Sequence, residues 1–258
     1  MRYHIDTIPV WDAMKLNSEC PLCAIRRKTE CVDIDRFLGS SVMEPDVRIV
    51  VNDLGFCGHH QELLFLERNK LGHALMLHTY MAETLKKLTA LYQSALPVSG
   101  KKRSLQAITT GNRQTKVKTN EILSEKIKQL TESCVICDSL KDNMNRYAYT
   151  FMHLWKTSTE FKRVFSDCKG LCIPDSALLL STASAYLNGS DYDTFSNELV
   201  RVQLKNLKRV EEELKLFTLK FDYRNQDKPW GESRNAIERT INKLHGWHVG
   251  EEPNPKAK

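Results

Sequence analysis

The sequence is poor in the residues that tight turns and β-sheets require. Its 258 residues include only 11 glycines and 8 prolines, and aromatic residues make up 8% of the chain. So few turn-forming residues argue against a fold built from many short strands. We therefore expect an all-α, mostly helical protein, and 41% hydrophobic residues are enough to build a buried core.

Long apolar runs are also missing. No stretch approaches the roughly 18 consecutive apolar residues of a membrane-spanning helix. The N-terminal sequence MRYHIDTIPVWDAMK carries charges throughout and lacks the apolar stretch of a secretion signal. We accordingly expect a cytoplasmic protein that does not associate with membranes. In that reducing compartment, paired cysteines are more often metal ligands or redox groups than structural disulfides.

Motifs of the common enzyme classes do not occur in the sequence. It has no glycine-rich phosphate loop, no GxSxG nucleophile motif and no HExxH metalloprotease motif. Whether the protein is an enzyme therefore stays open at this stage.

The cysteines carry the strongest pattern. Two CxxC pairs occur, Cys20 with Cys23 and Cys134 with Cys137, and each precedes a glycine–apolar–cysteine triplet. Cys23 lies 34 positions before Cys57, and Cys137 lies 35 positions before Cys172. This matching spacing predicts an internal repeat, with two duplicated helical halves that are each organised around a CxxC…CxxH/D metal site.

The repeat divides the chain into two helical halves, 1–96 and 121–250. The intervening segment 97–120 holds six basic and no acidic residues, which equals the whole formal net charge of +6. Because it has few large apolar residues, we expect a basic, flexible linker there. The proline-containing end, 251–258, is expected to be a disordered tail.

Apolar periodicity predicts several helices. In the first half we expect a long helix over 58–96, with a short segment over 46–51 before it. Its apolar stripe at the 3.6-residue period consists of Leu71, Leu75, Met81, Leu85, Leu88 and Tyr92. His78 falls on this stripe, so we expect it in the core rather than at a metal. In the second half we expect helices over 121–132, 135–156 and 192–221, a capped segment over 160–165, a helix beginning near Pro174 and one over 227–247.

A turn brings positions i and i+3 together, so CxxC and CxxH each form a clip that offers two ligands to one ion. Two clips complete the tetrahedral shell of a structural zinc site. In the first half we predict the shell Cys20, Cys23, Cys57 and His60. We prefer His60 to its neighbour His59, because the i+3 residue of a first helical turn faces the same way as the cysteine.

The second half departs from this pattern at its last ligand. There the predicted shell holds Cys134, Cys137 and Cys172, and Asp175 stands where the repeat has histidine. Asp175 keeps the geometry of the repeat, whereas Cys168 would give an all-thiolate site. If neither completes the shell, the open position would make this second site the place for chemistry.

Zinc is the expected metal at both sites, and an iron–sulfur cluster is the alternative. Sets of three cysteines with a histidine or aspartate can hold such clusters, but two separated clips resemble zinc sites more than compact ferredoxin runs. Cys31 stands alone within a predicted helix, and we expect it to be a core residue.

The motifs Cys20-Pro-Leu-Cys23, Gly55-Phe-Cys-x-x-His60, Lys169-Gly-Leu-Cys-x-Pro174, Phe221-Asp-Tyr-Arg224 and Pro229-Trp-Gly231 run through nearly the whole chain. Together they resemble an uncharacterised family of bacterial proteins, common in Firmicutes, that is classed as a domain of unknown function. The resemblance implies a cytosolic bacterial protein and no particular activity. In that family the second clip usually ends in histidine, where this chain has Asp175.

Three functions agree with these features. The first is a zinc-stabilised adaptor that binds an unknown protein partner, and the second is an iron–sulfur or metal-dependent redox enzyme with its chemistry at the second site. The third is a nucleic-acid-associated protein that uses the basic segment 97–120, although this segment lacks aromatic residues to stack on bases. The sequence does not determine the oligomeric state.

Overall fold

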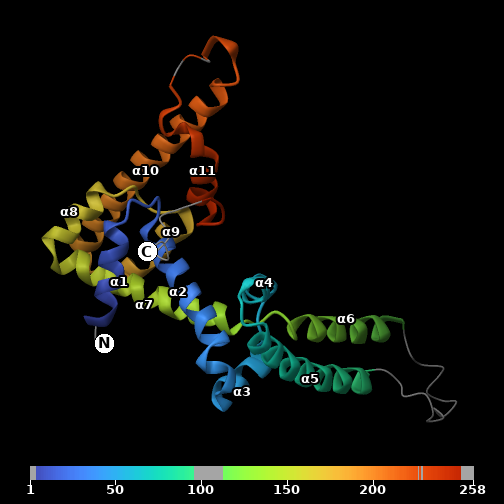
Figure 1. Cartoon of the computed structure of the whole chain (residues 1–258). Coiled ribbons are helices and arrows are strands. Elements are labelled where there is room, and N and C mark those ends of the chain that lie inside the picture. The colour runs from blue at the N-terminus through green and yellow to red at the C-terminus, as the bar shows by residue number, and fades with distance from the viewer. Residues whose placement is uncertain (1–3, 96–112, 226, 228, 251–258) are drawn as a thin grey trace, which may run out of the picture. The chain divides into compact units, whose positions relative to one another are not determined.

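The structure is a computed structural model that describes residues 4–95, 113–225, 227 and 229–250 (Figure 1). These residues form α-helices and short 3-10 helices, and none of them lies in a strand, which confirms the predicted all-α fold class. Within the same ranges, no helix combines the length and the hydropathy that crossing a lipid bilayer requires.

The chain forms two compact units whose boundaries differ from those of the two sequence halves. Met1–Glu30 and Leu140–Lys258 make up the first, which we call the terminal unit, and Cys31–Ser139 make up the second, which we call the central unit. The division falls inside two continuous helices, α2 (Pro21–Leu38) and α7 (Val135–Thr157). Each unit therefore draws on residues from both halves of the sequence.

The terminal unit contains a large apolar core. Besides parts of α2 and α7, it consists of α1 (His4–Lys15), α8 (Thr159–Asp167), α9 (Ile173–Tyr186), α10 (Gly189–Leu219), α11 (Ala236–His245) and the 3-10 helices η3 (Tyr223–Asn225) and η4 (Gly231–Asn235). Fully buried aromatic side chains from α7, α8 and α10 form its centre. Phe151 meets the edges of Phe161 and Phe165 at centroid distances of 4.9 and 5.4 Å, which is a favourable aromatic geometry.

Local signals set the helix starts in this unit. The Ser158 side chain accepts a hydrogen bond from the backbone N–H of Phe161 and so caps α8. Pro174 occupies the first turn of α9, where its missing N–H costs nothing. Both starts agree with the sequence prediction. The predicted helix over 227–247 is shorter, because η4 precedes α11.

The central unit contains η1 (Ser40–Met43), α3 (Pro45–Leu54), α4 (Gly58–Leu66), α5 (Lys70–Ala95) and α6 (Arg113–Gln129). The single helix predicted over 58–96 is therefore wrong, since α4 and α5 are separate. Asn69 explains the break: its carboxamide oxygen accepts the N–H of Gly72, and its amide donates to the carbonyl of Leu38.

The basic segment 97–120 is only partly described. Residues 113–120 form the start of α6 rather than a linker. The rest of the predicted linker, 97–112, and the predicted tail, 251–258, lie outside the described residues.

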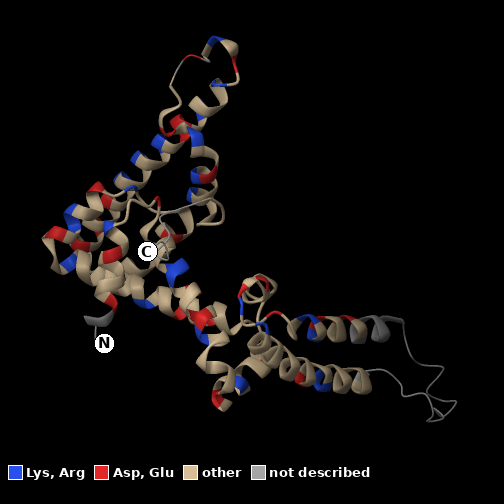
Figure 2. Ribbon diagram, in the orientation of Figure 1, with Lys and Arg blue, Asp and Glu red and all other residues tan. Residues whose placement is uncertain are grey.

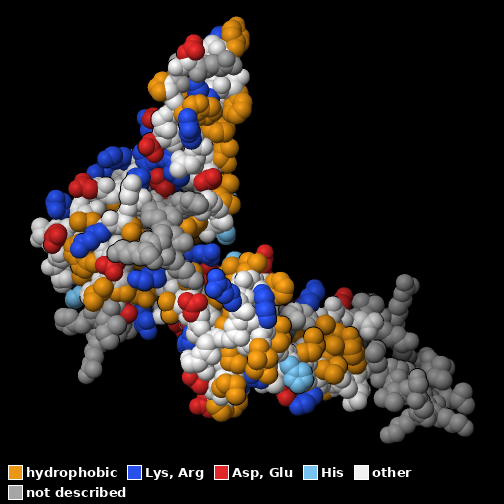
Figure 3. Space-filling view, in the orientation of Figure 1, with side chains coloured by type: hydrophobic (Ala, Val, Ile, Leu, Met, Phe, Trp, Pro, Cys, Tyr) orange, Lys and Arg blue, Asp and Glu red, His pale blue; other side chains and the backbone are white. Residues whose placement is uncertain are grey.

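Helix α5 packs on α3 and α6, and its buried positions lie opposite its apolar stripe. Gly72, His73 and Met76 are buried, whereas Leu71 and Met81 are 72% and 67% exposed. The expectation that His78 lies in the core is wrong, because this residue is exposed. Figure 3 shows hydrophobic side chains gathered over α5.

Candidate metal centres

The predicted ligands gather in two groups, one in each unit. In each group, four donor atoms lie within 4.8 Å of one another. The central group consists of Cys57, His60, Cys134 and Cys137, and the terminal group consists of Cys20, Cys23, Cys172 and Asp175.

The predicted pairing of the clips within each sequence half is wrong. The structure places the CxxC clip of the second half beside Cys57 and His60 of the first half. It places the CxxC clip of the first half beside Cys172 and Asp175 of the second half. The two halves thus exchange partners, so each group joins segments that are distant in the sequence.

All four clips lie where a helix begins. Cys57 and Cys172 are the N-cap residues of α4 and α9, while Cys20 and Cys134 directly precede α2 and α7. Two helix N-termini therefore meet in each group. Their free N–H groups and dipoles stabilise negative charge on the sulfur atoms.

The capping geometry explains the i, i+3 spacing. The sulfur of Cys20 accepts the N–H of Cys23 at 3.4 Å, and the sulfur of Cys172 accepts the N–H of Asp175 at the same distance. One helical turn thereby brings the two ligands of a clip to the same side. The corresponding contact from Cys137 to Cys134 measures 3.5 Å.

The turn before each downstream clip requires glycine. Gly55 and Gly170 have φ of 66° and 80°, a left-handed conformation that side chains with a Cβ disfavour. A Cβ at Gly55 would also lie 2.4 Å from the ring of Tyr80. The following residues, Phe56 and Leu171, are buried and fix the clips to the core.

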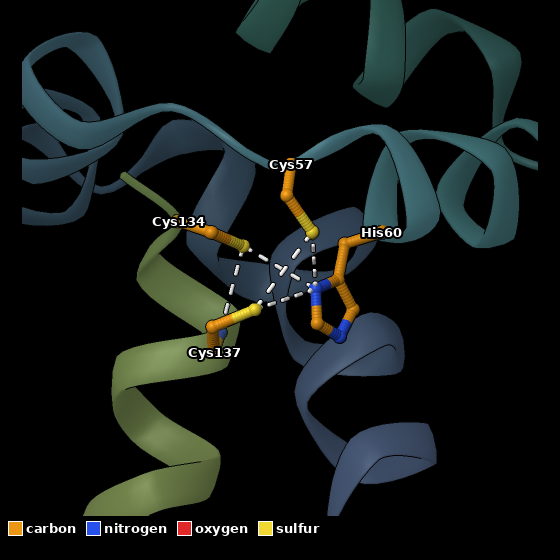
Figure 4. A group of neighbouring side chains, drawn as sticks. All are labelled: Cys57, His60, Cys134 and Cys137. Carbon is orange, nitrogen blue, oxygen red and sulfur yellow. Dashed lines mark hydrogen bonds between the residues drawn. The ribbon is translucent and has the colours of Figure 1, made fainter. Parts of the chain in front are cut away.

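In the central group, the side chains converge on the Nδ1 atom of His60 (Figure 4). This atom lies 3.2 Å from the sulfur of Cys57, 3.3 Å from that of Cys134 and 3.4 Å from that of Cys137. The sulfurs of Cys57 and Cys137 are 3.7 Å apart. The neighbouring His59 is not among these four donors.

The central group is partly open to solvent, since Cys137 is exposed and Cys57 is intermediate. Burial acts to raise the pKa of Cys134, but the hydrogen bond with His60, the backbone hydrogen bonds from Cys137 and Cys57 and the charge of His60 together outweigh it and lower this pKa to about 6. Burial and the nearby sulfurs of Cys134 and Cys57 raise the pKa of Cys137 to about 12. One thiolate therefore forms readily here even before a cation binds.

The terminal group is closed, because all four residues are buried. Oδ2 of Asp175 lies 3.3 Å from the sulfurs of both Cys20 and Cys23, and the sulfurs of Cys23 and Cys172 are 3.6 Å apart. Burial raises the pKa of Cys20 well above its usual value. Protons and metal thus compete for this site, and a cation must displace thiol protons to enter.

Arg26 forms an ion pair with the carboxylate of the terminal group. Its guanidinium donates to Oδ1 of Asp175, which leaves Oδ2 turned toward the cysteines. Three thiolates and a carboxylate carry more negative charge than one divalent cation neutralises, so this cationic neighbour lowers the cost of burying them.

The residues that precede the two clips of each group also form contacts that link the clips. In the central unit, Ser133 Oγ donates to the carbonyl of Leu54 at 2.7 Å. In the terminal unit the matching positions are Glu19 and Lys169. There, Lys243 of α11 donates to both backbone carbonyls and forms a 3.2 Å ion pair with the Glu19 carboxylate.

These distances fit a single tetrahedral ion. Zinc–sulfur bonds of about 2.3 Å and zinc–nitrogen bonds of about 2.0 Å place neighbouring ligand atoms about 3.5–3.8 Å apart. The observed contacts lie close to that range without an ion between them. Both groups can therefore hold a metal ion with only small side-chain movements.

The remaining cysteines lie outside the two groups. Cys168 follows α8 and its sulfur accepts the N–H of Gly170 at 3.3 Å, so of the two candidates for the fourth position only Asp175 joins the terminal group. Cys31 is partly buried in α2.

Sequence reasoning missed Arg26, Ser133 and Lys243. Arg26 follows Cys23 by three positions on α2, a spacing that places both on one helix face and that gives a usable signal. Lys243 carries no such signal, because only the folded chain brings α11 to the clips.

The comparisons with known proteins agree with the motifs that define these groups. The model of a family described as a family of unknown function, DUF6062, matches residues 1–251. No curated protein and no solved structure matches the chain. Since the match covers both CxxC pairs, both downstream clips and the C-terminal segment, the chain belongs to the DUF6062 family.

Proposed function

We propose that the protein binds two zinc ions, one in each group, and that these ions stabilise a helical scaffold that acts as an adaptor for another protein chain. The observation that carries this proposal is the meeting of two distant clips at each group, with four donors within 4.8 Å. Three cysteines with one histidine form a typical structural zinc site, and aspartate oxygen also binds zinc.

The spacing of the donors favours one ion over an iron–sulfur cluster. In a [4Fe–4S] cluster each cysteine binds its own iron, and in a [2Fe–2S] cluster two ligands bind each of two irons, so the four ligands surround more than one metal atom. Here all four donor atoms of each group lie within 4.8 Å of one another, which fits a single ion. Zinc is also redox-inactive, which suits a structural role.

A structural role agrees with the position of the groups. Each joins helix N-termini from segments that are more than 70 positions apart, such as His60 and Cys134. The unfolded chain does not bring such segments together and so lacks the assembled site, which couples metal binding to folding. No residue outside the four is needed to complete either shell.

The test is the metal content of protein purified without added metal, together with its absorption spectrum. We expect two zinc ions per chain, no visible colour and loss of helical circular dichroism when a strong chelator is added. If the purified protein contained iron and absorbed visible light, a redox function would be favoured over this proposal. A chain that folds fully without metal would refute the structural role.

A cobalt-substituted sample separates the adaptor from a metal-dependent enzyme. Co²⁺ in closed tetrahedral sites gives visible bands that added azide leaves unchanged, because no position is free to bind it. A shift of these bands with azide would show an open coordination position and would favour catalysis at the metal.

A further inference from the structure

Helix α5 exposes a continuous apolar face. Leu71, Met81, Leu85, Tyr92 and Leu75 are 72%, 67%, 61%, 42% and 37% exposed, respectively. At 3.6 residues per turn these side chains lie within an arc of about 120° over about 30 Å of helix. An arc of that width is what a helix normally turns toward a protein core.

The opposite face of α5 forms its contacts within the central unit. Arg48 of α3 donates to the carbonyl of Leu75 and to the hydroxyl of Thr79, at 2.9 and 2.8 Å. The hydroxyl of Tyr80 donates to the carbonyl of Leu130 at 3.0 Å. These polar anchors fix the rotation of α5, so the apolar face cannot turn inward.

Charge is absent from the apolar face. Among its 26 residues, α5 has only Lys70, Glu83, Lys86 and Lys87 as charged side chains, and most of its ribbon carries neither sign (Figure 2). At 100° per residue, Glu83, Lys86 and Lys87 all fall outside the apolar arc. An uncharged surface of this shape suits another apolar helix rather than a charged ligand.

We propose that this face is the interface of a homodimer, in which α5 packs antiparallel against α5 of a second copy of the chain. Its exposed apolar side chains present on the order of 500 Å², the size at which an apolar patch marks an interaction site. A standard interface buries about 800 Å² per partner, and about 60% of that is apolar, so the area matches what a stable dimer needs.

The face is complementary to itself in the antiparallel direction. When the two-fold axis passes between residues 83 and 84, Leu75 meets Tyr92 of the second copy, and the small Ala82 meets the larger Leu85. The same register pairs His78 with Thr89, the two polar side chains along the centre of the face, so each gains a hydrogen-bonding partner. Parallel packing would instead place His78 against His78 of the second copy.

The test is the molar mass of the full zinc-loaded chain by light scattering, compared with that of the variant Leu85→Glu. We expect the wild type to have twice the 29.7 kDa mass of one chain. Because Leu85 and its copy lie on either side of the axis, Leu85→Glu should bring two carboxylates together and weaken association at least tenfold. Leu204→Glu on α10 is the control, since Leu204 is 63% exposed and Leu85 61%.

Mixing variants of opposite charge tests the pairing itself. Leu85→Lys should also be monomeric, and an equal mixture with Leu85→Glu should form dimers again, because unlike charges then meet across the axis. All variants should keep their zinc and helicity, so failure here is separable from failure of the zinc proposal. A monomeric wild type overturns the proposal and leaves the face to a different helical partner, and a dimer that Leu85→Glu does not weaken also refutes it.

Discussion

The sulfur atoms of Cys23 and Cys172 lie 3.6 Å apart, although 149 positions separate them in the sequence. The central unit shows the reciprocal arrangement, with Cys57 and Cys137 at 3.7 Å. Each candidate metal site thus closes a long loop between the two sequence halves. Loss of an ion should affect a whole unit rather than one local turn.

Arg26 should tune the terminal site without being a ligand. Its guanidinium orients the Asp175 carboxylate and offsets the negative charge of the cysteines. We predict that Arg26→Met lowers zinc affinity at this site by about 10–100-fold, the usual effect of removing a ligand's hydrogen-bonding partner. Competition with a coloured chelator measures this affinity.

Arg27→Met provides the matched control, because Arg27 follows on the same helix but pairs with Glu30 instead. It should leave zinc affinity unchanged. Equal losses in both variants would mean that general charge, rather than the contact with Asp175, is responsible.

Lys243 should be essential to the terminal unit's stability. It is 1% exposed, and it donates to the carbonyls of Glu19, which directly precedes the clip of Cys20, and of Lys169, three positions before Cys172. Lys243→Met would leave both carbonyls without this donor, whereas Glu19 keeps its ion pairs with Arg209 and Arg239, and we expect a loss of about 1–3 kcal/mol in the free energy of unfolding. Urea denaturation measures this, and exposed Lys208→Met should lose almost nothing.

The two sites should release zinc at different rates. Cys137 is exposed and Cys57 partly so, whereas all four terminal ligands are buried. A chelator should therefore remove the central ion first and the terminal ion more slowly, which native mass spectrometry can follow. Cys57→Ser should abolish the fast phase, and a single rate for both ions would contradict this difference.

His73 should make the central unit less stable in mild acid. Burial, together with nearby Lys70, lowers the pKa of His73 below its usual 6.5, and the ring bonds Gln61 Oε1 at 2.8 Å. Below about pH 6.5 the unfolded chain binds a proton that the folded chain rejects, so stability falls as pH drops toward the folded pKa. The contribution of neutral His73 to the free energy of unfolding is fully present above about pH 6.5.

Urea unfolding at about pH 7.5 and about pH 5.5 tests this prediction, with His73→Gln as the comparison. The wild type should lose more stability between these pH values than the variant. Effects of pH on the metal ligands are common to both proteins and cancel in the difference. Equal losses would show that His73 does not contribute.

The sequence predicted the two ligands of each clip correctly, but it did not predict which clips meet. The spacing of Cys57 to His60 and of Cys172 to Asp175 identified residues that share one helical turn, because capping geometry is local. Which clips meet depends on tertiary packing of α2, α4, α7 and α9, and similar separations of 34 and 35 positions leave both pairings equally possible. The internal repeat itself stays a prediction.

The same distinction applies to α5. Periodicity located the helix and its apolar face from Leu71 to Tyr92, yet it could not tell whether that face contacts the chain's own core. The break at Asn69 escaped notice because a single carboxamide, bonded to Gly72 and Leu38, produces it.

Zinc content of two double variants tests the exchanged pairing most directly. Cys57→Ser with Cys137→Ser damages only the central group, so one zinc per chain should remain. Cys23→Ser with Cys57→Ser damages both groups, so none should remain after mild chelation. The reverse result, no zinc in the first variant and one in the second, would contradict the exchange of clips between the two halves.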